Sequence, residues 1–307
     1  MLKNVLKSVG EYKKETILSP VTVALEVLLE VLIPYFMAVL IDKGINTGDM
    51  TEIIKYGMLL VVLAMAALAF GALSGHYAAV ASAGFAKNLR KRMFYKVQDF
   101  SFLNIDHFST SSLVTRMTTD ITNVQNAYQM IIRVAVRAPI MLIMAFFMAF
   151  KVNSELATIY LWVIPILGIA LAFIMTHVHP IFVRVFKTYD KLNNVVQENV
   201  HGIRVVKSFV REDFEEQKFK KISSSIYKDF TKAEKMIAFN APVMQICVYT
   251  CMILISWIGA NLIVGGTMTA GELTSMFTYT MQILMSLMML SMIFVITIMS
   301  KASVERI

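Results

Sequence analysis

Six apolar stretches divide the chain, and they constrain its fold more than any other feature of the sequence. A helix of about 20 apolar residues crosses the hydrocarbon core of a bilayer, which is roughly 30 Å thick. In this chain 57% of the residues are hydrophobic and 16% are charged, whereas soluble domains carry about 25% charged residues. We therefore expect an all-α integral membrane protein with six transmembrane helices. The expected spans are residues 17–41, 57–83, 134–150, 156–176, 243–264 and 273–299.

The basic residues indicate which connections face the cytoplasm. Of the 29 Lys and Arg residues, only Lys43, Lys55 and Lys151 lie in the three short connections between spans. Basic residues next to spans favour the cytoplasmic side. We therefore expect a multi-pass protein of the cell membrane, in contact with the lipid bilayer, with both termini and both long connections in the cytoplasm. This topology accounts for the net charge of +8, so no nucleic-acid partner is expected.

The two long connections, residues 84–133 and 177–242, are predicted to be helical hairpins, which we call the first and the second stalk. Neither Gly nor Pro occurs in residues 85–138 or 203–241, and segments without these breakers favour continuous helix. Arms of about 25–30 residues would extend about 40 Å beyond the membrane. The basic, amphipathic residues 1–16 are expected to form an interfacial helix on the cytoplasmic leaflet.

The sequence ENVHGIRVVKSFVREDFEEQKF, residues 198–219, marks the turn of the second stalk. Apolar residues at helical spacing, beginning at Val205, predict a helix that ends near Val210. Asp213, with Glu216 three residues later, predicts the start of the next helix through an N-cap and its capping partner. The tip of the second stalk should therefore lie between two short helical segments.

Two aromatic residues, Phe209 and Phe214, are predicted at this tip. Exposed aromatic side chains are typical of contact surfaces. Packing of these two rings against the neighbouring stalk would account for them equally well. Arg211 and Glu215 are one helical turn apart and are expected to pair.

The first stalk has a comparable polar turn within NIDHFSTSSLVTRMTTD, residues 104–120. Asp and Ser or Thr residues favour helix caps and turns over helix interiors. The residues of this type that cluster here are Asp106, Ser109, Thr110, Ser111 and Ser112. Both hairpins are therefore predicted to bend at polar tips that face the cytoplasm.

Glu26 and Glu30 lie one turn apart within the first expected span. A charged group at this depth costs several kcal/mol, so it usually faces a cavity or a partner. The pair is interpreted either as a site for cationic substrate groups or protons, or as a helix–helix hydrogen bond with one carboxyl protonated.

The sixth expected span is rich in methionine. Flexible thioether side chains suit a surface that must fit many ligands, and filling of a lipid-facing surface would account for them as well. The candidates for a substrate cavity are Met281, Met285, Met288 and Met292, together with Glu26 and Glu30.

The sequence predicts no metal site and no catalytic residue. His177 and His179 are two residues apart and point to different faces of a regular helix. Cys247 and Cys251 are four residues apart on one apolar helix, where packing is the expected role.

Several stretches together resemble the transmembrane domain of ABC exporter half-transporters. Residues 198–219 are similar to the second intracellular loop of that family, and IDHFSTSSLVTRMTTDI is similar to the first. GELTSMFTYTMQILMSLMMLSMIF and SKASVERI resemble its sixth span and the approach to its ATP-binding domain. The resemblance covers nearly the whole chain, residues 1–307, and is strongest to subunits of bacterial multidrug exporters that often work as heterodimers.

The resemblance implies that each stalk tip is a coupling helix seated in a groove of an ATP-binding domain. The first coupling helix would then use Asp106, His107, Phe108, Ser109 and Arg116. The second would use Phe209, Arg211, Glu212 and Phe214.

The resemblance also implies ATP-driven export of hydrophobic or amphipathic small molecules by two paired halves, in a homodimer or a heterodimer. The dipeptide Gly-Lys of the phosphate-binding loop does not occur in the sequence. We therefore expect this chain to hold no cofactor and not to hydrolyse ATP alone, with ATP and Mg²⁺ bound by nucleotide-binding domains on a longer parent chain or on a separate polypeptide. The alternatives are a carrier or channel not driven by ATP, or a scaffold with signalling stalks.

Overall fold

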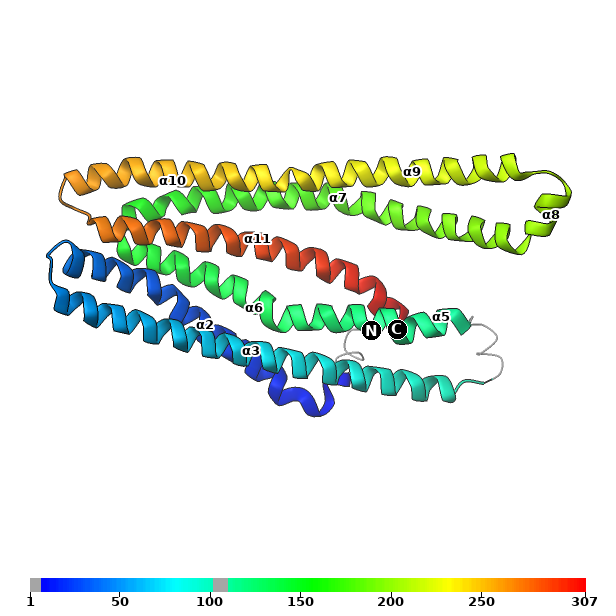
Figure 1. The fold of residues 1–307 in the computed structure, drawn as a ribbon, viewed down its shortest axis with the longest axis horizontal. Helices are drawn as coiled ribbons and strands as arrows, with labels where there is room; N and C mark the ends of the chain where they lie inside the picture. The colour runs from blue at the N-terminus through cyan, green and yellow to red at the C-terminus, as the bar shows by residue number, and fades with distance from the viewer. Residues whose placement is uncertain (1–6, 102–109) are drawn as a thin grey trace. The chain divides into compact units, whose positions relative to one another are not determined.

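The computed structural model describes residues 7–101 and 110–307, which form helices joined by turns (Figure 1). By their internal contacts they divide into a first unit, Met1–Ile164 with Val248–Ile307, and a second unit, Pro165–Cys247. The elements in chain order are η1 (Lys7–Tyr12), α2 (Lys13–Leu40), η2 (Ile41–Ile45), α3 (Met50–Gln98), α5 (Thr110–Thr115), η3 (Arg116–Asp120), α6 (Ile121–Val152), α7 (Ser154–His201), α8 (Ile203–Ser208), α9 (Glu212–Ala238), α10 (Asn240–Val264) and α11 (Ala270–Arg306).

Six helical segments are long and apolar enough to cross a bilayer, so the predicted six-span, all-α fold is confirmed. They are Lys7–Ile45, Met50–Gln98, Ser112–Val152, Ser154–His201, Glu212–Val264 and Ala270–Ile293. Helix α3 has 49 residues and α7 has 48, whereas a span needs about 20. The excess length provides the predicted helical extensions.

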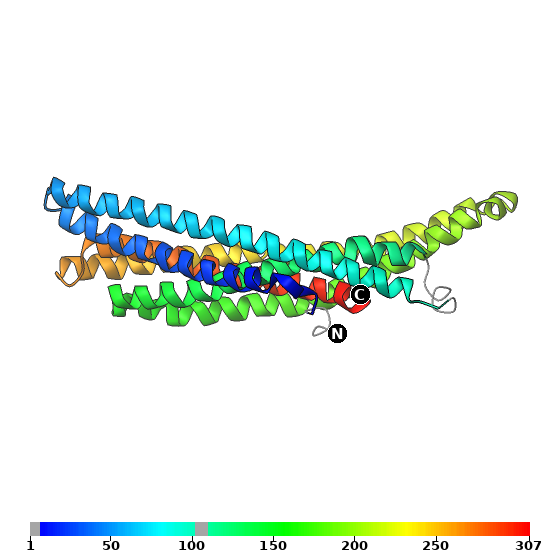
Figure 2. The ribbon, with the colours of Figure 1, turned by 90° about the horizontal axis from the view of Figure 1, so that it is seen from below.

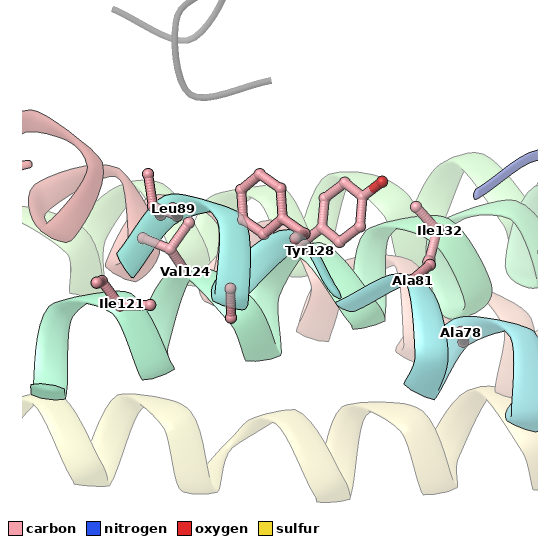
Figure 3. Packing of buried hydrophobic residues seen from close by; sticks show 9 residues of the cluster. Ala78, Ala81, Leu89, Ile121, Val124, Tyr128 and Ile132 are labelled. Atoms are coloured by element: carbon pink, nitrogen blue, oxygen red, sulfur yellow. The ribbon is translucent and has the colours of Figure 1, made fainter. Parts of the chain in front are cut away.

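In the first unit, α3 and α6 pack through one hydrophobic cluster (Figure 3). The rings of Phe85 and Tyr128 stack with their centroids 4.5 Å apart and their planes inclined by 14°. Small residues such as Ala78 and Ala81 let the helices approach closely around this pair. The Tyr128 hydroxyl lies 2.9 Å from the Thr16 hydroxyl, which connects α2 to the same cluster.

The end of α11 is fixed to the start of α6 by a buried carboxylate. Asp120 is 1% exposed, and its Oδ1 accepts hydrogen bonds from Ser303 Oγ at 2.9 Å and from Arg306 Nη2 at 2.7 Å. Val304 and Ile307 pack against the α3–α6 cluster beside these bonds. The last turns of α11 are therefore held by both polar and apolar contacts.

The first described residues also pack on α3. Arg92 donates a hydrogen bond of 2.8 Å to the buried hydroxyl of Ser8, and a Cβ atom at Gly84 would overlap the ring of Tyr12. Residues 7–12 form a 3₁₀-type segment with a left-handed Gly10, and α2 begins directly after it. The interfacial role expected for residues 1–16 stays a prediction, and residues 1–6 lie outside the described residues.

Two buried tyrosines connect α11 to other helices of the first unit. Tyr160 OH lies 2.7 Å from Thr280 Oγ1, and Tyr279 OH donates to the carbonyl of Val31 at 2.9 Å. In a bilayer there is no water to satisfy such hydroxyls, so each must find a partner within the protein. These bonds fix α11 against α2 and the first turns of α7.

At the opposite end of α11, Asp42 of η2 caps the helix. Its carboxylate accepts hydrogen bonds from Thr269 Oγ1 at 2.6 Å and from the backbone N–H of Gly271 at 3.0 Å. A Cβ atom at Gly271 would overlap the carbonyl oxygen of Ala38, so only glycine allows this close approach. Thr269 and Glu272 complete a capping box at the same helix start.

The second unit is a helical hairpin in which α7 and α9 run side by side and α8 lies at the turn (Figures 1 and 2). Its core contains Val178, Ile181, Val185, Ile226 and Ala233. At its surface, Arg184 donates to both oxygens of Asp229, at 2.7 and 2.8 Å. The predicted helical hairpin of the second stalk therefore has its own apolar seam.

We expect Asp120→Ala to loosen the end of α11 without unfolding α6. The change removes two hydrogen bonds to a carboxylate, each of which contributes about 1.5–3 kcal/mol. Opening of the last turns should then rise at least about tenfold, measured as faster amide hydrogen exchange in residues 300–307. Asp42→Ala, at the far end of α11, is the matched control. Unchanged exchange in 300–307 would show that the apolar contacts alone hold this segment.

Candidate functional site

Three charged side chains meet inside the helical bundle of the first unit. Glu26 and Glu30, one turn apart on α2, both face Arg137 of α6. Arg137 donates through Nη1 to Glu26 Oε1 and through Nη2 to Glu30 Oε2, the latter at 2.6 Å. The side chains are 13% exposed for Glu26, 34% for Glu30 and 24% for Arg137, so the cluster is partly shielded.

This arrangement depends on a small residue in the neighbouring helix. A Cβ atom at Gly71 of α3 would lie 3.0 Å from Glu26 Oε1. Because glycine has no side chain, the carboxylate can sit against α3 and still reach Arg137. The sequence identified both glutamates but not their partner, since Arg137 lies 111 residues away from Glu26.

A cavity of about 230 Å³ opens beside the cluster. Its lining residues come from α2, α6 and α11 and are Glu30, Arg137, Ala138, Met141, Met281, Gln282, Met285, Ser286 and Met289. Of the predicted cavity residues, Glu30, Met281 and Met285 line it. Glu26, Met288 and Met292 do not, and the two methionines are 44% and 56% exposed.

Gln282 was not predicted as a cavity residue. In the sequence it stands out only as a single amide side chain within an apolar span. Gln282 Oε1 and Glu26 Oε2 are both buried, and neither accepts a hydrogen bond from any described residue. Buried polar atoms in proteins are nearly always hydrogen-bonded. Because Gln282 lines the cavity, its oxygen is available to a hydrogen-bond donor that enters there.

The second predicted site, the tip of the second stalk, consists of α8 and the start of α9. Helix α8 ends at Ser208, earlier than the predicted end near Val210. Val210 has a left-handed backbone with φ of 50°, which ends the helix and turns the chain. The aromatic residues Phe209 and Phe214 are 73% and 58% exposed, so the structure does not bury them within the stalk.

Two sequence expectations for this tip are wrong in detail. Helix α9 begins at Glu212 with Arg211 as its N-cap, so Asp213 lies inside the first turn and does not cap it. Glu215 does not pair with Arg211; its Oε2 accepts from Asn199 Nδ2 at 2.8 Å. The second difference arises because the fold brings α7 beside α9 and supplies Glu215 with a partner from the other arm.

The charged residues at the tip have other partners. The Arg211 guanidinium lies 5.9 Å from the centroid of the Phe214 ring. Glu212 accepts from Lys207 Nζ at 3.0 Å across the turn. The exposed aromatic surface of the tip is thus bordered by fixed charges.

Behind the tip, a groove of about 750 Å³ runs between the two arms of the hairpin. Its apolar wall includes Val195, Val196, Val200, Ile203 and Phe219. The groove lies in the second unit alone, so its shape is a property of the hairpin itself.

The first stalk tip is only partly described. Asp106, His107, Phe108 and Ser109 lie outside the described residues. Arg116 is the first residue of η3, a π-helical turn that precedes α6. Among residues 7–101 and 110–307, no three His, Cys, Asp or Glu side chains lie close enough to hold a metal ion.

Comparison with known proteins identifies the fold. The family description "ABC transporter transmembrane region" matches residues 16–288. An uncharacterized ABC transporter ATP-binding protein of Bacillus subtilis is 32% identical over 282 residues, which cover 92% of this chain and 49% of that protein. A similarly described protein of Mycobacterium bovis is 29% identical over 90% of this chain and 47% of its own length.

More distant relatives include proteins with a named substrate. The ATP-dependent lipid A-core flippase of Pseudomonas savastanoi is 25% identical over 72% of this chain and 36% of its own length. The chain spans about half the length of the Bacillus and Mycobacterium proteins that it matches. The matched residues 16–288 extend from the first candidate span into the sixth. The chain belongs to the ABC transporter transmembrane-region family.

Proposed function

We propose that this chain is the substrate-translocating domain of an ATP-driven exporter and works paired with a second exporter half, as a homodimer or a heterodimer. Its relatives are ABC transporter ATP-binding proteins, which supports coupling to nucleotide-binding domains that use ATP and Mg²⁺. The substrates proposed are hydrophobic or amphipathic small molecules, in keeping with the methionine-lined cavity of the first unit.

The observation that carries this proposal is the exposed aromatic tip of the second stalk. Helix α9 alone has 27 residues, which corresponds to about 40 Å at 1.5 Å per residue. A rigid helical hairpin of this length can transmit movement only if a partner grips its end. Phe209 and Phe214 offer the exposed aromatic anchors that such contacts use.

The tips of both stalks are proposed to serve as coupling helices. In the second stalk the contact residues would be Phe209, Arg211, Glu212 and Phe214. In the first stalk they would be Asp106, His107, Phe108, Ser109 and Arg116. The boundaries proposed for the two stalks are residues 84–133 and 177–242, with both termini in the cytoplasm.

A carrier or channel not driven by ATP would have no use for such a tip. In that case the aromatic residues would be expected to pack within the hairpin. The exposure of 73% for Phe209 and 58% for Phe214 favours the exporter.

We expect Phe214→Ala in the complete transporter to uncouple ATP hydrolysis from transport. Truncation of an aromatic anchor weakens a contact by about 2 kcal/mol or more, which corresponds to about 30-fold weaker docking of the tip. Transport in proteoliposomes should fall strongly while thermal stability stays unchanged, because the ring is 58% exposed. Transport and ATPase activity are measured on the same preparation.

Phe239→Ala is the matched control, since Phe239 is 68% exposed at the opposite end of α9. It should leave both transport and stability unchanged. A loss of many degrees in the unfolding temperature of Phe214→Ala would place the ring in the hairpin core and contradict the coupling role.

The proposed orientation is tested by labelling single cysteines in intact cells. Cysteines at Asn46, Ser154 and Thr267 should react with an impermeant maleimide from outside, because they lie in the short connections between spans or at the helix end beside one. A cysteine at the exposed Ser223 should react only after permeabilisation. Cys247 and Cys251 are first replaced by Ser and Ala to remove the background. Labelling of Ser223→Cys from outside would reverse the topology.

A further inference from the structure

The two carboxylates of Glu26 and Glu30 share one ion-pair partner among the described residues, the guanidinium of Arg137. The next cation on α6, Arg133, lies against Gly75 of α3, one turn from the Gly71 beside which Glu26 sits, and is a neighbour of Glu26 that forms no ion pair with it. Glu30, which lines the cavity, therefore has a single ion-pair partner within the described residues, and it shares that partner with Glu26.

The cavity wall has an unused hydrogen-bond acceptor. Gln282 Oε1, from a residue that lines the cavity, is buried, and no donor among the described residues reaches it. A buried acceptor without a donor is unfavourable by about 1–3 kcal/mol. A ligand that brings N–H groups and a positive charge would give Gln282 a donor and Glu30 a second ionic partner.

The rest of the cavity wall is apolar and adaptable. Met141, Met281, Met285 and Met289 surround a volume of about 230 Å³. Thioether side chains are polarizable and change shape easily, so they fit varied apolar bodies. The combined chemistry suits a small molecule with an ammonium head and a hydrocarbon body.

We propose that this cavity binds a protonated primary or secondary amine with an apolar body, and that Arg137 is a tethered cation with which the ligand competes for Glu30. The inference rests on the proposed export function, of which it would be one substrate subsite. An anion would meet the Glu30 carboxylate here, and a neutral hydrocarbon would leave the buried Gln282 oxygen without a donor.

The competition has a consequence that a simple acidic pocket would not show. Removal of a carboxylate should weaken amine binding, whereas removal of Arg137 should strengthen it, because Glu30 then loses its resident partner. In the double variant Glu26→Gln with Arg137→Gln, one carboxylate and the one guanidinium are removed together. Its net charge equals that of the wild type, but Glu30 is free.

The test measures equilibrium binding of radiolabelled benzylammonium and of its neutral isostere ethylbenzene to the protein in lipid nanodiscs, with empty nanodiscs subtracted. Glu30→Gln should weaken benzylammonium binding about tenfold, as expected for loss of one charged contact of about 1.4 kcal/mol, and change ethylbenzene binding less than twofold. Arg137→Gln should tighten benzylammonium binding several-fold. If that variant does not fold, the double variant gives the answer and should bind at least as tightly as the wild type.

Two methionines of α11 provide the matched control for position. Met285→Ala, in the cavity wall, should weaken both probes, whereas Met288→Ala, outside the wall, should change neither. Equal benzylammonium affinity in the wild type and Glu30→Gln would overturn the proposal, as would weaker binding in the double variant. Because ATP is absent, failure of the Phe214 experiment would refute coupling and leave this result standing.

Discussion

The structure depends first on the need of each backbone N–H and C=O group in the hydrocarbon core for a partner within its own segment. That requirement makes every span a helix, and the helices then continue far beyond the bilayer. Helix α3 is a single helix of 49 residues and α7 is a single helix of 48 residues. The proposed stalks are thus extensions of the spans themselves, so that a movement at one end of such a helix would be carried along its continuous backbone hydrogen bonds.

The same constraint governs side chains that are polar within the bundle. Tyr160, Tyr279 and the Glu26–Glu30–Arg137 cluster all find partners on other helices, and these bonds determine which helices lie together. Helix α11 takes part in both tyrosine contacts and is also held at both ends, by Asp42 and by Asp120. It is therefore the element through which events at the two ends of the first unit would be connected.

The two candidate sites use opposite physical principles. At the stalk tip, Phe209 and Phe214 leave large apolar rings in water, and this unfavourable exposure is what a partner surface would remove. In the bundle, two carboxylates and a buried acceptor oxygen are shielded from water, and among the described residues both carboxylates pair with Arg137. We propose that a macromolecule covers the first site and that a small cation binds at the second.

The sequence by itself determined the six spans, the helical hairpin of the second stalk and the approximate place of its turn, because these follow from local periodicity and from where Gly and Pro are absent. It also marked Glu26 and Glu30 as unusual. Only the tertiary structure decided that Arg137 bridges them, and that α8 ends before the left-handed Val210. Partners more than a hundred residues apart are chosen by helix packing, which leaves no periodic signal in the chain. Glu215 shows the same limit, since Asn199 on the opposite arm replaced its neighbour Arg211.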